Sequence, residues 1–207
     1  MEEKLKEIKD KAKTHADLFS VMQDLMAVMK TCSSLKKILQ DGSKDGVLIQ
    51  NLWTAALIRY ARCFASGKRF KLNISLLKNL EGEPVKVHEL YINLRNKHIA
   101  HSVNPFEQYE DGIIIDDKQK KVVAVSTLGM TLIALEEKGI HQLGLLSNVF
   151  YKEAKRQYDI ITEQMLSLLS QIPLEILSTK KPLRIYAPGS EDAHVAREVF
   201  ITKDKKS

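Results

Sequence analysis

A long amphipathic pattern at the start of the chain constrains the fold most strongly. Over residues 2–29 the apolar side chains recur at steps of three and four positions, a spacing that places them on one face of an α-helix. The members of this stripe are Leu5, Ile8, Ala12, His15, Leu18, Phe19, Met22, Leu25, Met26 and Met29. We therefore predict a long first helix whose stripe, methionines included, packs in the core.

Similar patterns predict three further helices, over residues 47–65, 85–100 and 141–171. The helix over 47–65 is apolar around much of its circumference, which indicates a central place among the helices. A short helical turn over 73–80 follows it, and Pro84 fits the first turn of the next helix because its missing N–H costs little there. The patterns together predict a mainly helical domain.

The period of the apolar pattern changes after the helix over 85–100. At about residues 112–126, two β-type runs joined by a polar turn predict a β-hairpin inserted into the helical domain. We assign the helical domain to residues 1–177 and a C-terminal extension to residues 178–207. Two segments of that extension, 183–186 and 195–202, fit edge strands near the hairpin, and the last residues fit a frayed end.

Composition narrows the class of protein. The chain never approaches the run of about 18 apolar residues that a membrane-spanning helix needs. Residues 1–4 alternate in charge and lack the apolar region of a signal peptide, so we expect a cytoplasmic protein that is not bound to a membrane. Cys32 and Cys63 lie within apolar helical patterns without metal-ligand spacing, and we predict that they are small buried hydrophobes. We expect no metal and no cofactor.

Basic residues are concentrated in one part of the chain. The formal net charge is +6, and the stretch from Arg59 to His101 accounts for all of it, with nine basic residues and three acidic ones. Such a concentration of positive charge suits a partner that carries phosphates, although a solvated helix face has the same pattern. The candidate RNA-phosphate ligands in this stretch are Arg59, Arg62, Lys68, Arg69 and Lys97.

The segment from Arg95 to His101, with the sequence RNKHIAH, combines residue types that suit phosphate chemistry. At about 100° per residue, Arg95, His98 and His101 fan across one side of the helix end, while Asn96 points elsewhere unless the terminus is distorted. An arginine can hold a phosphate by two parallel hydrogen bonds, and a histidine can accept and return a proton near neutral pH. This pair suits cleavage of RNA through its own 2′-hydroxyl, without a metal.

Residues 94–102, LRNKHIAHS, resemble the signature of the HEPN superfamily of α-helical proteins. That signature is an arginine, an adjacent polar residue and a histidine a few positions later, and Arg95, Asn96 and His101 fill these places. His98 is an accessory candidate. The similarity extends loosely over residues 46–107, where an aromatic-rich helix precedes the motif as in uncharacterised bacterial members.

The resemblance implies a helical bundle that forms a homodimer, in which two motif helices share one cleft. Active members are metal-independent endoribonucleases of toxin–antitoxin, phage-defence and RNA-processing systems, so RNA and an antitoxin or other protein are the implied partners. Many other members are non-catalytic interaction or binding modules. The hairpin and the extension depart from the compact bundle, which leaves the catalytic and non-catalytic interpretations both open.

Two further interpretations of the motif stay open. His98 and His101 are three positions apart and, with Glu107, Glu110 or Asp111, have the spacing of a metal site, although Arg95 would repel a cation. In the second interpretation, the histidines and lysine only cap the last carbonyl groups of a helix.

Overall fold

The structure, a computed structural model, describes residues 2–65, 67, 69–101, 105–179 and 187–195. The chain divides into two compact units, Met1–Leu169 and Ser170–Ser207. The described residues are mainly helical, with one two-stranded antiparallel sheet, as the sequence predicts. None of the described helices is both long enough and apolar enough to cross a membrane.

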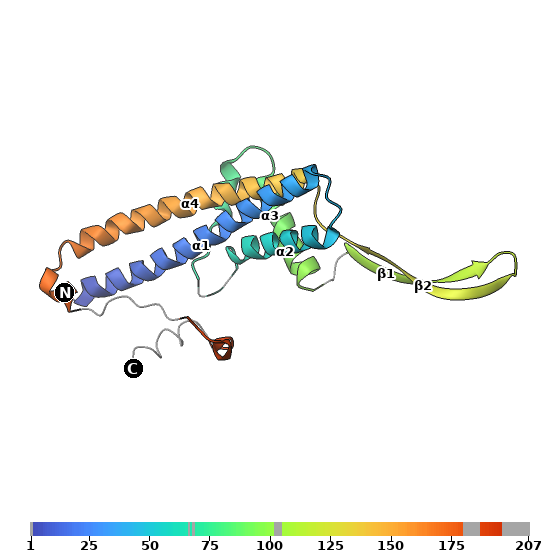
Figure 1. Cartoon of the computed structure of the whole chain (residues 1–207). Coiled ribbons are helices and arrows are strands. Elements are labelled where there is room, and N and C mark those ends of the chain that lie inside the picture. The colour runs from blue at the N-terminus through green and yellow to red at the C-terminus, as the bar shows by residue number, and fades with distance from the viewer. Residues whose placement is uncertain (1, 66, 68, 102–104, 180–186, 196–207) are drawn as a thin grey trace. The chain divides into compact units, whose positions relative to one another are not determined.

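Four helices build the first unit: α1 (Glu2–Gln40), α2 (Gly46–Arg62), α3 (Pro84–Asn93) and α4 (Glu137–Leu169). Helices α1 and α4 run side by side over most of their length, and α2 lies against α1 (Figure 1). Helix α1 continues well past residue 29, because its apolar stripe extends through the fully buried Leu35.

The core lies where α1, α2, α3 and α4 meet, and it is rich in aromatic side chains. Trp53 and Tyr60 of α2, Tyr91 of α3 and Phe150 of α4 are all buried, and Tyr60 meets both Tyr91 and Phe150 in edge-on ring contacts. Edge-on packing suits the charge distribution of aromatic rings. Helix α2 is less central than its all-round apolar pattern predicts, because Val47, Leu48 and Ile58 remain exposed.

Polar contacts fix the packing of α1 against α4. The His15 ring stacks on Tyr158 with 3.9 Å between ring centroids, and His15 Nε2 is 2.9 Å from Thr162 Oγ1.

Both cysteines are free and buried, which confirms the prediction that they serve as small hydrophobes. Burial raises the pKa of each thiol to about 12, so neither is a reactive thiolate near neutral pH.

The predicted helix over 85–100 is divided into two parts. Helix α3 ends at Asn93, and a π-helical turn, η2 (Leu94–Ile99), follows it. The Ala100 N–H donates to the Arg95 carbonyl at 3.0 Å, which is the five-residue step of a π-helix. A short 3-10 helix, η1 (Ile74–Asn79), lies where the sequence predicts a helical turn, and Asn73 caps it.

The hairpin is longer than predicted. Its strands are β1 (Glu107–Asp116) and β2 (Lys121–Thr131), rather than a hairpin confined to residues 112–126. The polar start of β1 has no strand propensity of its own and becomes a strand because it pairs with the second half of β2. In the described part of the chain the hairpin joins the helices at its base (Figure 1), where the Leu132 N–H donates to the Phe106 carbonyl at 2.8 Å.

The second unit contains a short helix, α5 (Leu174–Ser178), and a 3-10 turn, η3 (Ser190–Asp192). The predicted strand over 183–186 lies outside the described residues, as does nearly all of the one over 195–202. The division after Leu169 falls eight residues before the predicted boundary at residue 177.

Candidate functional site

An open basic pocket lies in the first unit between the end of α2, the segment before η1, α3 and η2. Its volume is about 580 Å³, and its floor is formed by apolar side chains such as Leu72 and Ile92. The polar side chains that line it are Arg62, Lys71, Asn73, His88, Arg95 and Asn96. The described lining residues therefore include three cationic side chains and no carboxylate.

The π-helical turn brings both motif residues Arg95 and Asn96 to this pocket. On a regular helix Asn96 is predicted to point away from Arg95, but the wider turn changes the angular position of the residues within it. The Nη1 atom of Arg95 donates a hydrogen bond to Asn96 Oδ1 at 2.9 Å. Among the described residues, the exposed Arg95 guanidinium bonds no other side chain, so its remaining N–H groups are available to a ligand.

His88 is a pocket residue that sequence analysis did not select. It lies one helical turn before Ile92, and two turns before Arg95, on the face of α3 that lines the pocket. Its Nδ1 is 2.8 Å from the Tyr60 hydroxyl, and its ring meets Phe64 edge-on at 4.6 Å. Burial lowers the pKa of His88 to about 4, so the imidazole is neutral at pH 7. His88, Ile92 and Arg95 are four and three positions apart, which places them on one face of a helix. This spacing is the sequence signal that could have identified His88 as a site residue.

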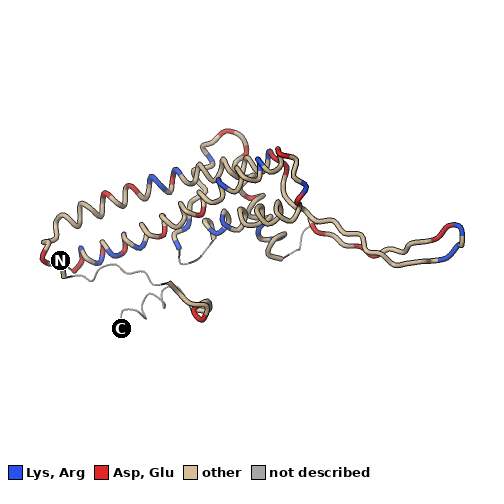
Figure 2. Tube along the Cα trace, in the orientation of Figure 1, with Lys and Arg blue, Asp and Glu red and all other residues tan. Residues whose placement is uncertain are grey.

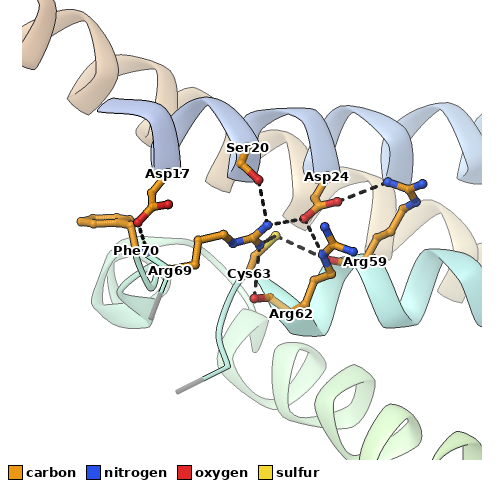
Figure 3. A network of polar contacts seen from close by, with 8 residues as sticks. All are labelled: Asp17, Ser20, Asp24, Arg59, Arg62, Cys63, Arg69 and Phe70. Carbon is orange, nitrogen blue, oxygen red and sulfur yellow. Dashed lines mark hydrogen bonds and ion pairs between the residues drawn. The ribbon is translucent and has the colours of Figure 1, made fainter. Parts of the chain in front are cut away.

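A second basic region, here called the Asp24 cluster, gathers three arginines around one buried carboxylate (Figure 3). Asp24 is 3% exposed, and its Oδ2 lies 2.7 Å from Arg62 Nε and 2.7 Å from Arg69 Nη1. Its Oδ1 lies 3.2 Å from Arg59 Nη1. Sequence analysis missed Asp24 because a single acid on a charged helix has no distinctive pattern.

The Asp24 cluster and a neighbouring aspartate attach α1 to the end of α2 and to the segment beyond it. Arg69 also donates from Nη1 to Ser20 Oγ at 3.1 Å, and the buried Asp17 accepts the Phe70 N–H at 3.1 Å (Figure 3). Arg59 and Arg69, both predicted RNA-phosphate ligands, are therefore engaged in holding the fold. Arg62 belongs to both regions, since it pairs with Asp24 and also lines the pocket.

The other predicted site residues lie apart from the pocket lining. His98 is buried at the base of the hairpin, where its Nε2 is 3.4 Å from the Leu132 carbonyl oxygen and its ring packs edge-on near Phe106. Lys97 and His101 are exposed on the same segment but do not line the pocket. Lys68 lies outside the described residues. The structure thus brings Arg62, Arg95 and Asn96 to one pocket, and His101 is not among the residues that line it.

Within the described ranges, no three histidine, cysteine, aspartate or glutamate side chains gather as a metal site would require. The pair His98 and His101 has no third ligand there from the start of β1.

Comparisons with known proteins identified no relative of this chain. No protein family, curated protein or solved structure matches the chain.

Proposed function

We propose that this chain binds RNA and holds a backbone phosphate in the pocket lined by Arg62, Lys71, Arg95 and Asn96. The observation that carries the proposal is the convergence of three cations, without any carboxylate among the described lining residues, on one open pocket. Its volume of about 580 Å³ lies within the range of roughly 300 to 1,000 Å³ that is usual for ligand sites.

The chemistry of the lining side chains suits a phosphate. The free guanidinium N–H groups of Arg95 can grip two phosphate oxygens, and the exposed Lys71 adds a mobile point charge. Asn73 and Asn96 supply amide groups that can donate to the ribose or to a base edge. A π-helical turn is often found at functional sites, which also favours this segment.

A metal-independent endoribonuclease of the HEPN kind is the second candidate function, and the exposure of both Arg95 and His101 on one short segment supports it. The proposed roles are those suggested by the resemblance: Arg95 and Asn96 hold the phosphate, and His101 exchanges a proton with the 2′-hydroxyl or the leaving oxygen. From the same resemblance we also propose a homodimer in which two motif segments share one cleft, and an antitoxin or other protein as a partner.

The binding test compares Arg95→Ala with Lys97→Ala on short single-stranded RNAs, using fluorescence anisotropy. Both changes remove one exposed cation from the same turn, but only Arg95 lines the pocket. We expect Arg95→Ala to weaken binding by about tenfold, or about 1.4 kcal/mol, and Lys97→Ala to weaken it far less. Equal losses in the two variants would contradict the pocket as the binding site and leave only a diffuse basic surface.

The cleavage test incubates the full chain with varied RNAs, with and without a chelator. If the endoribonuclease proposal holds, cleavage persists with chelator, is abolished by His101→Ala, and RNA binding by that variant is retained. If the wild-type chain binds RNA but leaves it intact, the non-catalytic binding module is the correct function.

A further inference from the structure

The β-hairpin exposes apolar side chains on both of its faces. Ile113 and Val125 form a cross-strand pair on one face and are 61% and 73% exposed, while Ile114 and Ala124 form the next pair on the other face. Leu128 is 77% exposed. A two-stranded hairpin without further packing is marginally stable in water, and large exposed apolar surfaces usually mark an interaction site.

The two edges of this hairpin differ in charge. Strand β1 carries four acidic residues along its length: Glu107, Glu110, Asp111 and Asp116. Strand β2 carries Lys121 at its first position and then no charge from Val122 to Thr131 (Figure 2). In the described part of the chain each strand pairs only with the other, so each keeps one edge without a strand partner. Natural proteins usually protect such an edge with charges, and beyond Lys121 only β1 has them.

We propose that β2 pairs edge to edge with β2 of a second copy of this chain, forming a four-stranded antiparallel sheet in the order β1–β2–β2′–β1′. A neutral strand can pair with its own copy about a two-fold axis without placing like charges opposite one another. The same pairing through β1 would bring two strands with four carboxylates each side by side. The acidic β1 edges therefore remain outside and limit the sheet to four strands.

Contacts with the helical part fix the position of the hairpin base. The buried His98 contacts the Leu132 carbonyl oxygen, and the Leu132 N–H donates to the Phe106 carbonyl, so the hairpin is anchored where it leaves the helices. Higher up, the Tyr109 ring lies directly over Gly129, where a Cβ atom would come within 2.6 Å of the ring. This cross-strand cover fits the role of aromatic side chains in protecting a glycine within a strand.

This contact is separate from the contact between motif helices that the HEPN resemblance implies, and it does not depend on RNA binding. The test measures self-association of the full chain by sedimentation equilibrium over a concentration series. Val125→Lys places a charge within the proposed β2–β2′ contact. Ile113→Lys places the same charge on the paired residue of β1, where the two copies would be about three strand spacings, or roughly 14 Å, apart.

We expect the wild-type chain to dimerise and Val125→Lys to weaken the dimer by about tenfold or more. When β2 overlaps its copy along its whole length, the two added lysines are diagonal neighbours across the contact and repel each other. Ile113→Lys should leave it nearly unchanged. Mixing Val125→Lys with Val125→Glu should restore a heterodimer, which shows that both variants still form the hairpin. A monomeric wild type, equal weakening by both lysine variants, or no recovery on mixing would each overturn the proposal.

Discussion

Two basic regions lie side by side in this protein and use their arginines differently. In the Asp24 cluster, three arginines surround a carboxylate that is 3% exposed, and their charge is partly neutralised. In the pocket, Arg95 has only the neutral Asn96 side chain as its partner among the described residues. Both regions contribute to the same basic stretch of sequence. The number of cations in a stretch of sequence therefore does not indicate how many are available to a ligand.

Arg62 connects the two regions. Its Nε pairs with Asp24 while the side chain, which is 52% exposed, lines the pocket. Asp24 therefore positions one of the pocket cations, although it does not line the pocket itself. A change in the cluster should reach the pocket through Arg62, whereas a change at Arg95 should leave the cluster intact.

The largest expected effect is on stability and comes from Asp24→Asn. The substitution removes the buried charge that three partly exposed arginines share, and we expect the free energy of unfolding to fall by about 2 to 3 kcal/mol in urea denaturation. Asp10→Asn, an exposed position on the same helix, is the matched control and should change stability by less than about 0.5 kcal/mol. A loss as small as that of the control would show that the cluster does not hold the fold.

A loss of stability of intermediate size is expected when the pH is lowered. It arises from His88, which lines the pocket and is not part of the Asp24 cluster. Because the pKa of His88 is about 4 in the folded chain and about 6.5 when unfolded, the unfolded chain takes up the proton first as pH falls. The stabilisation is complete above the unfolded pKa and is lost as pH falls toward 4. Between pH 7 and pH 5 this amounts to about 2 kcal/mol.

Urea denaturation of His88→Gln at both pH values isolates this contribution. Glutamine can keep a hydrogen bond to the Tyr60 hydroxyl but does not titrate, so the variant should lose less stability between pH 7 and pH 5 than the wild type. An unchanged pH dependence would mean that His88 is not the titrating group.

The smallest expected effect is that of Arg59→Ala on stability. Arg59 is 48% exposed and makes the longest of the three contacts to Asp24, at 3.2 Å, while Arg62 and Arg69 remain. We expect a loss of less than about 1 kcal/mol by urea denaturation. A loss comparable with that of Asp24→Asn would show that the three arginines act as a unit rather than as unequal partners.

The elements of the fold could be largely predicted from the sequence, because their apolar periods are clear. The helix ends could not: the sequence gives no local signal for the π-helical turn that replaces the end of the helix over 85–100. Nor could the base of the hairpin be predicted, since residues 107–111 form a strand by pairing with residues 127–131 rather than by their own propensity.

The candidate site was predicted in part. Arg95 and Asn96 were selected and do lie in one pocket, but His88 was missed and His98 proved to be buried at the hairpin base. The roles of Arg59 and Arg69 depend on Asp24, which is 35 and 45 positions away in the sequence. Contacts at that separation arise from the packing of α1 on α2, and a local pattern of charges contains no information about them.

The most direct test of the central claim measures RNA affinity against salt concentration for the wild type, Arg95→Ala and Arg59→Ala. If the pocket arginine contacts a phosphate and the cluster arginine does not, Arg95→Ala should weaken binding by about tenfold and reduce the slope of log affinity against log salt by about one, at each RNA tested. Arg59→Ala should change neither appreciably. Equal effects of the two variants on affinity and slope would contradict the account.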